Sequence, residues 1–252
     1  MTATRVAALY DIHGNAPALE AVLAEVRESD VSEVVVGGDV VPGPMPGECL
    51  ALLRSLPMPV RCIQGNGESA VLTHLAGTDP ESIPRQAREV VAWVAGTLPR
   101  EESARFADWP LTTRLAIEGL GDVLFCHATP RNNTEVFTRL TPEATLRPIL
   151  EPTGATVVVC GHTHMQFDRT IGRLRVVNAG SIGMPIGQAA AHWLLLGPGV
   201  QLRRTTYDLQ AAAERVRGTD YPARKEFADR NVLEPPAEEE LLPLYERMAL
   251  KA

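Results

Sequence analysis

The segment RVAALYDIH, residues 5–13, decides the interpretation of this chain, because an apolar run there ends in two side chains that can bind a cation. A short run of this kind, closed by polar residues, is typical of a buried β-strand. Asp11 and His13 are therefore expected just beyond the carboxyl end of a strand.

Four more apolar runs are followed by polar residues in the same way. They are Val34 to Val36 before Gly38-Asp39, Val60 to Ile63 before Gly65-Asn66, Val123 to Cys126 before His127, and Thr156 to Cys160 before Gly161-His162-Thr163-His164. Aligned strands would deliver these side chains to one edge, where open α/β sheets usually bind ligands.

The seven candidate ligands are Asp, His and Asn, and none is Cys. Oxygen and imidazole donors suit hard or borderline divalent cations, and seven ligands are too many for one ion. Taken singly, each motif has an ordinary explanation: Gly38-Asp39 as a turn, His127 as a core histidine, and His162-x-His164 as two rings on one strand face. Their complete order after five strands instead predicts a hydrolytic site with two metal ions.

The ordered motifs resemble those of the calcineurin-like metallophosphoesterase superfamily, and within it the small bacterial phosphodiesterase-type members. That family's pattern is Asp-x-His, Gly-Asp, Gly-Asn-His-Asp/Glu, a His, and Gly-His-x-His, and the match runs from Val6 to about Gly183. The resemblance implies an α/β fold, a four-layer α-β-β-α sandwich of two packed mixed sheets flanked by helices. We expect a single domain over residues 1–252, with a helical C-terminal extension from about residue 208.

The resemblance also implies a role for each ligand. Asp11, His13 and His164 would hold one metal ion, Asn66, His127 and His162 the other, and Asp39 would bridge the pair. Asp39, Asn66 and His127 are the expected catalytic residues. Manganese is the expected metal, with iron, zinc, nickel and magnesium as alternatives.

The implied activity is that of a metal-dependent phosphoesterase acting on phosphodiesters or activated phosphomonoesters. Two ions roughly 3.5–4 Å apart would clamp the phosphoryl group and supply a hydroxide near neutral pH. Gly67 departs from the family pattern, because its commonest form has there a His that is usually assigned as proton donor to the leaving group. A His introduced at position 67 is expected to weaken the dependence of the rate on the leaving-group pKa, provided that its ring can reach the leaving oxygen. Glu68 is expected in the first turn of a helix.

Two residues outside the ligand set are candidates for binding the substrate phosphate. Asn15 follows the first motif, although it has an equal claim to be the N-cap of a helix. Arg131 follows His127 and could contact phosphate through two N–H groups, with an ordinary surface arginine as the alternative. His74 and His192 are expected to be structural.

Two other classes of protein are open. Residues 179–183, AGSIG, approach the Gly-x-Ser-x-Gly nucleophile motif of serine hydrolases, but Met184-Pro185 follows where a helix should begin. A catalytically weak protein-interaction scaffold on the metallophosphoesterase fold is the second alternative, and Gly67 is its main support.

The composition fits a compact enzyme. The 252 residues are 45% hydrophobic and carry a formal charge of −7, which argues against nucleic-acid or membrane binding by bulk electrostatics. The four scattered cysteines form no metal motif, and the apolar start is too short for a signal peptide. We expect a cytoplasmic protein with a small phosphate-ester substrate, and a homo-oligomer is left open.

Periodicity and turn residues predict the remaining elements. A Pro/Gly loop over residues 41–47 is expected to rim the site. Helices are expected over 15–28, 48–56, 69–76, 83–108 with a break near Leu98-Pro99, 209–216 and 237–250, and hairpins over 112–126, 166–177 and 190–206.

Overall fold

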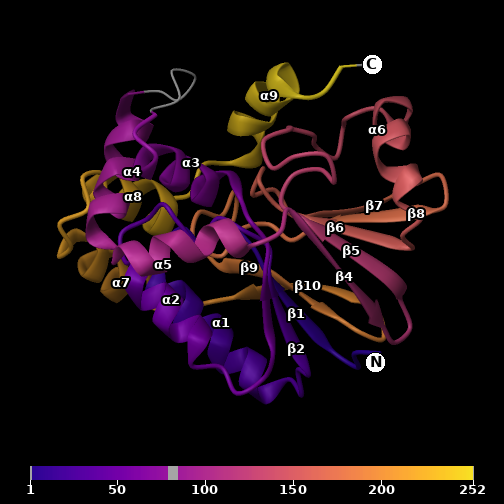
Figure 1. The fold of residues 1–252 in the computed structure, drawn as a ribbon, viewed down its shortest axis with the longest axis horizontal. Coiled ribbons are helices and arrows are strands. Elements are labelled where there is room, and N and C mark those ends of the chain that lie inside the picture. The colour runs from indigo at the N-terminus through magenta and orange to yellow at the C-terminus, as the bar shows by residue number, and fades with distance from the viewer. Residues whose placement is uncertain (1, 79–84, 252) are drawn as a thin grey trace.

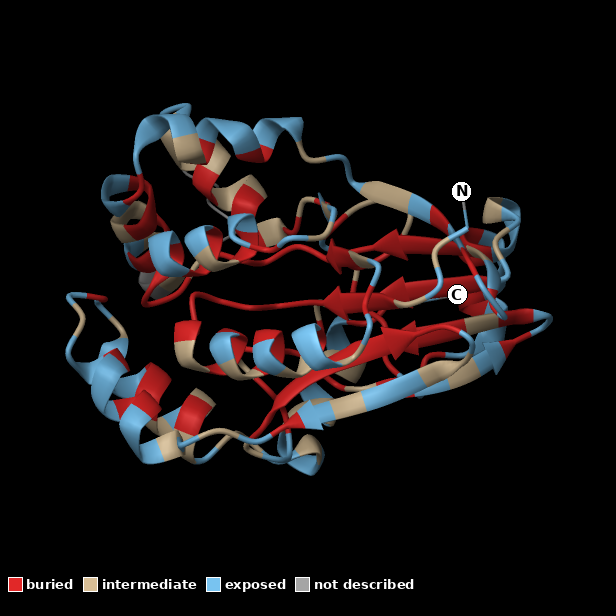
Figure 2. Cartoon of the chain, turned by 90° about the horizontal axis from the view of Figure 1, so that it is seen from below, coloured by how far each residue is buried: buried red, intermediate tan, exposed pale blue. Residues whose placement is uncertain are grey.

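Two mixed sheets pack face to face, and helices cover their outer faces (Figure 1). The computed structural model describes residues 2–78 and 85–251. Figure 2 shows the strands as two adjoining buried layers, with the exposed residues on the helices and at the edges. The expected four-layer α-β-β-α sandwich is confirmed.

The first sheet has the order β10-β9-β1-β2-β3. Its strands are β1 (Val6–Leu9), β2 (Glu33–Val36), β3 (Val60–Cys62), β9 (Ala191–Leu196) and β10 (Val200–Thr205). β1, β2 and β3 run parallel, whereas β9 is antiparallel to both β1 and β10. The carboxyl ends of β1, β2 and β3 therefore lie at one edge, and each of these strands precedes one of the predicted ligand motifs.

The second sheet has the order β4-β5-β6-β8-β7. Its strands are β4 (Thr112–Ile117), β5 (Gly121–Cys126), β6 (Val157–Cys160), β7 (Phe167–Ile171) and β8 (Leu174–Asn178). β5, β6 and β8 are parallel, while β4 and β7 are joined to them as antiparallel hairpin partners. The three predicted hairpins, β4–β5, β7–β8 and β9–β10, are thus confirmed.

The helical elements follow the predicted pattern with shifted ends. They are α1 (Ala16–Glu28), α2 (Pro46–Arg54), α3 (Asn66–Leu75), α4 (Arg85–Thr97), α5 (Arg100–Ala104), η1 (Arg105–Asp108), α6 (Glu143–Leu150), η2 (Glu151–Thr153), α7 (Leu209–Arg217), α8 (Arg224–Phe227), η3 (Ala228–Leu233) and α9 (Glu238–Met248). Residues 83–84 of the predicted helical stretch 83–108 lie outside the described residues. The sequence analysis predicted no helix at α6, which has Pro148 inside it, or at η2, α8 and η3.

The buried side chains form three layers that follow from strand alternation. Along β1, Val6 and Ala8 face the layer between the sheets, whereas Ala7 and Leu9 face the helices α1 and α2. A third layer packs α6 against the outer face of the second sheet. No helix within the described ranges is both long and apolar enough to span a lipid bilayer.

Candidate metal centre

The structure brings the seven predicted ligands together from both sheets. Asp11, His13, Asp39 and Asn66 follow the three parallel strands of the first sheet, and His127, His162 and His164 follow β5 and β6 of the second. Hydrogen bonds join the two groups of loops. The His162 backbone N–H donates to Asp11 Oδ2 at 2.9 Å, and His127 Nδ1 lies 2.9 Å from the Gly37 carbonyl oxygen.

Asp39 lies between two histidines. Its Oδ2 is 3.6 Å from His13 Nε2, and its Oδ1 is 3.6 Å from His127 Nε2. The carboxylate thus presents one oxygen to each side of the site. This is the arrangement that a bridging carboxylate requires.

Asp11 supplies the strongest indication that a cation belongs here. The side chain is fully buried, and its Oδ1 has no hydrogen-bond partner. This oxygen lies 3.3 Å from His164 Nε2 and 3.9 Å from both His13 Nε2 and His127 Nε2. Burial opposes ionisation of Asp11, but the charges of His164 and His127 outweigh it and hold the pKa of this carboxyl below its ordinary value.

Three imidazoles are oriented by backbone carbonyls. The Nδ1 atoms of His13, His127 and His164 lie 3.1, 2.9 and 2.8 Å from the carbonyl oxygens of Pro42, Gly37 and Met184. Because a carbonyl only accepts, each Nδ1 must be the donor, so in the neutral ring Nε2 carries the lone pair. A metal-ligating histidine is usually held by such a hydrogen bond from its other nitrogen.

This orientation places acceptors against acceptors. His13 Nε2 and His164 Nε2 are 3.2 Å apart, and His127 Nε2 is 3.0 Å from Asn66 Oδ1. Lone pairs at these distances repel unless a cation or a proton lies between them. The donor set and the unpartnered Asp11 oxygen therefore fit divalent metal ions. Two overlapping groups have donor atoms within 4.8 Å of one another, Asp11 with His13 and His164, and Asp11 with Asp39 and His127.

The charges of the ligands also shift the histidine pKa values. Burial lowers the pKa of His127 and His164, but the nearby carboxylates outweigh it, and both pKa values are raised. His162 stacks against His127 with ring centroids 5.1 Å apart. Burial first, and then the His127 charge, lower the pKa of His162 to about 4.

The backbone at the site is strained. Asp11, His13, Asp39, His162 and His164 all have left-handed φ values between 45° and 66°. The described part of the chain has one more non-glycine residue in this region, Asp30. Such conformations cost of order 1–3 kcal/mol each and cluster at functional sites, so five of the seven candidate ligands are held against a local conformational preference.

Glu68 organises the loops around Asp39, a role that the sequence-based interpretation missed. It lies in the first turn of α3, as expected, and is fully buried. Its two oxygens accept hydrogen bonds from the backbone N–H groups of Asp39, Val40, Val41 and Gly65 at 2.8–3.2 Å. Burial, and then the charge of Asp39, raise the pKa of Glu68 to about 7. The family's acidic position after Gly65-Asn66 was the available signal.

Gly67 is required by packing. A Cβ at this position would overlap the Val41 carbonyl oxygen and lie 2.8 Å from Pro42 Cδ. The Gly67 N–H donates to Asp39 Oδ1 at 2.7 Å. A His at position 67 therefore meets a steric obstacle on this backbone, because the 41–42 loop occupies the space of its Cβ.

The structure brings neither predicted phosphate-binding residue to the ligand cluster with a free side chain. Asn15 is fully buried at the N-cap of α1, where Oδ1 accepts from Ala18 N at 3.2 Å and Nδ2 donates to the Gly183 carbonyl oxygen at 3.2 Å. Arg131 is half exposed, and its guanidinium pairs with Glu135. Asn15 is thus the N-cap of α1, and phosphate binding by Arg131 stays a prediction.

Ser181 is placed as a structural residue. It is fully buried, its hydroxyl donates to the Asp11 carbonyl oxygen at 2.7 Å, and the same oxygen accepts from Met184 N at 2.8 Å. A serine nucleophile needs an exposed hydroxyl beside a general base. The hydroxyl is instead used to hold the Asp11 backbone, so the serine-hydrolase alternative loses its support.

A cavity of about 450 Å³ adjoins the ligand cluster. His13, Asp39 and Asn66 line one side of it, together with Pro42 of the loop that was expected to rim the site. The opposite side comes from α4, α8 and η3, which follow no motif in the sequence. The sequence analysis missed these lining residues, because ordinary apolar and amide side chains gave no local signal.

Comparison with known proteins agrees with the fold and shows the family. Residues 5–197 match the model of the calcineurin-like phosphoesterase superfamily domain, and the chain belongs to this family. It is similar to the uncharacterized protein MJ0912 of Methanocaldococcus jannaschii, with 25% identity over 239 residues that cover 86% of this chain and 93% of that protein.

Two solved structures share the fold over nearly the whole chain. One is the hypothetical protein PH1004 of Pyrococcus horikoshii OT3, with a TM-score of 0.75, 21% identity and coverage of 94% of this chain and 100% of that one. The other is a metallophosphoesterase from Sphaerobacter thermophilus, with a TM-score of 0.68, 22% identity and coverage of 91% and 98%. The fold similarity thus extends beyond residue 197, where the family match ends.

Proposed function

We propose that this protein is a metal-dependent phosphoesterase that hydrolyses phosphodiesters or activated phosphomonoesters at a dinuclear centre. The observation that carries the proposal is the position of Asp39, whose two oxygens each lie 3.6 Å from a different histidine Nε2. Asp11, His13 and His164 are assigned to one ion and Asn66, His127 and His162 to the other, and manganese is the proposed metal. When bound, the two ions would clamp the phosphoryl oxygens and make hydroxide available near neutral pH.

The protein's own residues prepare this site. Neutral imidazoles offer Nε2 lone pairs without adding negative charge. The Asn66 amide oxygen is likewise an uncharged ligand. The Gly67 N–H donates to Asp39 Oδ1 and so holds the carboxylate that is proposed to bridge the ions. The N–H groups of Asp39, Val40 and Gly65 donate to Glu68, which fixes the backbone around Asp39. Such preorganisation reduces the reorganisation needed during the reaction.

The proposed preference for activated esters is supported by residue 67. With glycine there, the usual proton donor to the leaving group is missing. A departing group must then be stable as an anion or receive its proton from elsewhere. Ordinary alkyl monoesters are poor substrates under this condition, because an alkoxide leaves with difficulty.

The complete ligand set favours an enzyme over an interaction scaffold. A scaffold gains nothing from holding five ligands in left-handed backbone conformations. The test is to purify the protein, measure its metal content, and assay bis(p-nitrophenyl) phosphate with Mn²⁺ added and after chelation. We expect about two metal equivalents and turnover that chelation abolishes and Mn²⁺ restores. Metal-free protein that gains no turnover from Mn²⁺ would favour the scaffold.

A further inference from the structure

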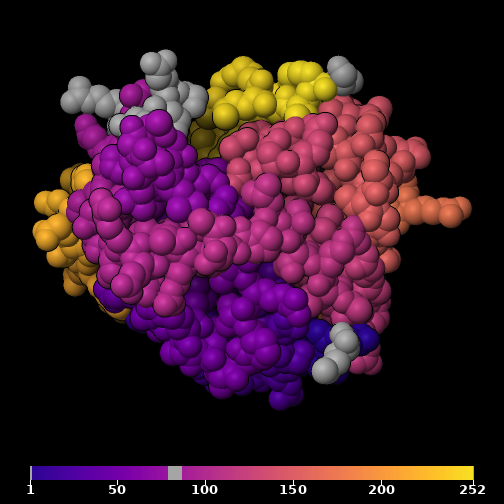
Figure 3. Space-filling view, viewed as in Figure 1, coloured from indigo at the N-terminus to yellow at the C-terminus, as the bar shows by residue number. Residues whose placement is uncertain are grey.

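The cavity beside the metal ligands has a second wall, built by α4 together with residues of α8 and η3. Ala87 and Val90 of α4 contribute to this wall. Phe227 of α8 and Asn231 of η3 line the same cavity as the proposed ligands. α8 and η3 lie beyond residue 197, where the family match ends. In Figure 3 the yellow residues at the top of the molecule belong to α9 and the end of the chain, which follow α8 and η3 in the sequence.

This wall is anchored in the core. Tyr221 and Phe227 are 5% and 3% exposed, and their rings meet edge to face with centroids 6.1 Å apart. Tyr221 also meets Trp93 of α4 at 5.3 Å, so the aromatic contacts tie α4 to α8. The wall is therefore preformed, and a ligand need not order it.

Asn231 sits on an unusual backbone. Residues Ala228–Leu233 form a π-helical turn, a rare geometry that is frequent at functional sites. Ala228 and Val232 are fully buried in the core, while Asn231 lines the cavity. Within the described residues, the side-chain amide of Asn231 has no hydrogen-bond partner. It thus offers a donor and an acceptor to whatever occupies the cavity.

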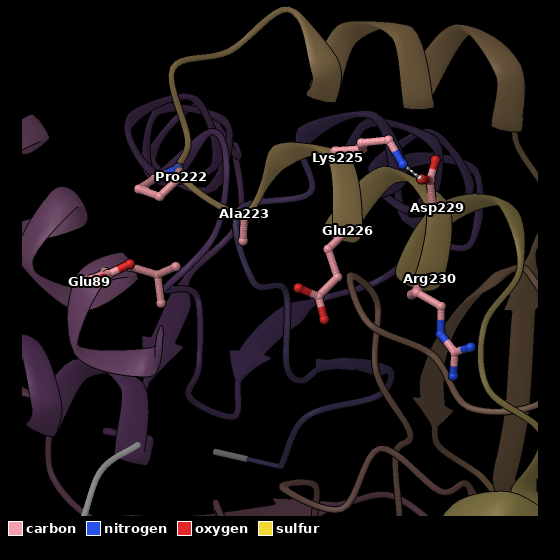
Figure 4. A pocket seen from close by; sticks show the side chains of 8 residues that line it. Glu89, Pro222, Ala223, Lys225, Glu226, Asp229 and Arg230 are labelled. Atoms are coloured by element: carbon pink, nitrogen blue, oxygen red, sulfur yellow. Dashed lines mark hydrogen bonds and ion pairs between the residues drawn. The ribbon is translucent and has the colours of Figure 1, made fainter. Parts of the chain in front are cut away.

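The cavity lacks a site for additional negative charge. Among its described lining residues none is Lys or Arg, and Glu226 contributes a carboxylate. Val90, Ala223 and Glu226 also line an adjoining cavity of about 510 Å³, and Figure 4 shows Glu226 pointing into that space. The cations there already have partners: Lys225 contacts Asp229 at 3.1 Å, and Arg230 contacts Glu240 at 2.9 Å.

We infer that this wall forms a subsite for the organic group of a phosphoester that remains on the phosphorus. The subsite takes a neutral group with an apolar or aromatic body and an amide-like hydrogen-bonding edge, which Asn231 recognises. It disfavours a group that bears a second phosphate, because none of the described residues that line the cavity is a Lys or Arg that could neutralise that charge. This inference rests on the proposed function, which places the first phosphate of the ligand at the metal centre. A cavity of this size holds one small molecule.

Binding tests the subsite without depending on turnover. Methyl phosphate, thymidine 5′-phosphate and thymidine 3′,5′-bisphosphate are titrated into the Mn²⁺-loaded protein by calorimetry. We expect thymidine 5′-phosphate to bind at least about tenfold more tightly than methyl phosphate, and the bisphosphate to lose most of that gain. Equal affinity for the first two ligands would overturn the subsite, and tighter binding of the bisphosphate would overturn the charge argument.

The residue assignment is tested with Asn231→Leu, which keeps the size and removes the amide. The affinity ratio of thymidine 5′-phosphate to methyl phosphate should fall about three- to tenfold. Gln201→Leu, an equivalent change at an exposed position on β10, should leave the ratio unchanged. A ratio that Asn231→Leu leaves intact would remove Asn231 from the proposal. Ala87→Trp, which fills the cavity from α4, should lower the same ratio by an independent route.

Kinetics separate failure of the subsite from failure of the proposed function. Three p-nitrophenyl phosphodiesters share p-nitrophenol as the leaving group. Their second ester group is methyl, thymidine joined through its 5′ oxygen, or the same thymidine carrying a 3′-phosphate. If none is hydrolysed while the binding order holds, the proposed function fails and the subsite stands. If all are hydrolysed with equal kcat/KM and bind equally, the subsite fails and the proposed function stands.

Discussion

Gly67 packs so closely against Val41 that a Cβ on residue 67 would overlap the Val41 carbonyl oxygen. Glu68 holds the backbone of both segments, because its carboxylate accepts hydrogen bonds from the N–H groups of Asp39 and Val41 and from that of Gly65. The absent histidine of the family motif is therefore tied to the path of the 41–42 loop. One change of residue cannot restore it.

Gly67→Ala should destabilise the protein. Overpacking against the backbone costs typically 1–3 kcal/mol, so we expect the free energy of unfolding to fall by about that amount. Gly96→Ala is the matched control, because Gly96 lies in α4 and its Cβ would meet no heavy atom within 4 Å. That control should stabilise by roughly 0.5–1 kcal/mol in urea denaturation. Equal stability of the two variants would contradict the packing argument.

The rate should depend steeply on the leaving group. A positioned general acid contributes about 10²–10⁴-fold, and a glycine at residue 67 contributes none. We expect kcat for a series of aryl methyl phosphates to fall steadily as the pKa of the phenol rises. A flat dependence would mean that another group in the cavity supplies the proton.

Asp39→Asn should remove at least one metal ion. The variant keeps the shape of the side chain but loses the charge and one of the two ligand oxygens. We expect activity to fall by at least ~100-fold with the fold retained by circular dichroism. Asp168→Asn, in an exposed pair with Arg175, is the control and should keep full metal content. Unchanged metal stoichiometry in Asp39→Asn would contradict the bridging assignment.

His164→Ala and His127→Ala should empty different sites. His164 shares its cluster with Asp11 and His13, whereas His127 contacts Asp39 and Asn66. Anomalous scattering from crystals of the two Mn²⁺-soaked variants reports the occupancy of each position. Depletion of the same position by both changes would show that the ligands are wrongly divided.

His192 should make the protein sensitive to acid. It is 1% exposed on β9, neither ring nitrogen has a hydrogen-bond partner, and burial, then the Arg204 charge, lower its pKa to about 4. Below a pH of about 6.5, the ordinary pKa of histidine, His192 is protonated in the unfolded chain but stays neutral in the folded protein. The free energy of unfolding therefore decreases as the pH falls toward 4. The loss is about 3 kcal/mol across that window. His192→Phe should flatten the dependence of unfolding free energy on pH, and an unchanged slope would refute this account.

Most of the strands and the polar side chains that follow them could be predicted from the sequence, whereas the two-sheet architecture and the roles of the ligands were implied by the resemblance to a known family. Each ligand motif directly follows a short apolar run, and the parallel arrangement of those strands puts their carboxyl ends at one edge. Both signals are local: strand periodicity is read over a few residues, and the ligand types stand beside it in the chain.

The tertiary structure alone decided what surrounds those ligands. Asn15 was equally able to cap a helix or to bind phosphate until Gly183, 168 residues away, accepted its N–H. The same holds for Gly67, whose need for glycine comes from Val41, and for Asn231, which reaches the cavity only because a π-helical turn packs against the core. These positions depend on contacts between segments far apart in the chain, and ordinary side chains carry no local pattern that records such contacts.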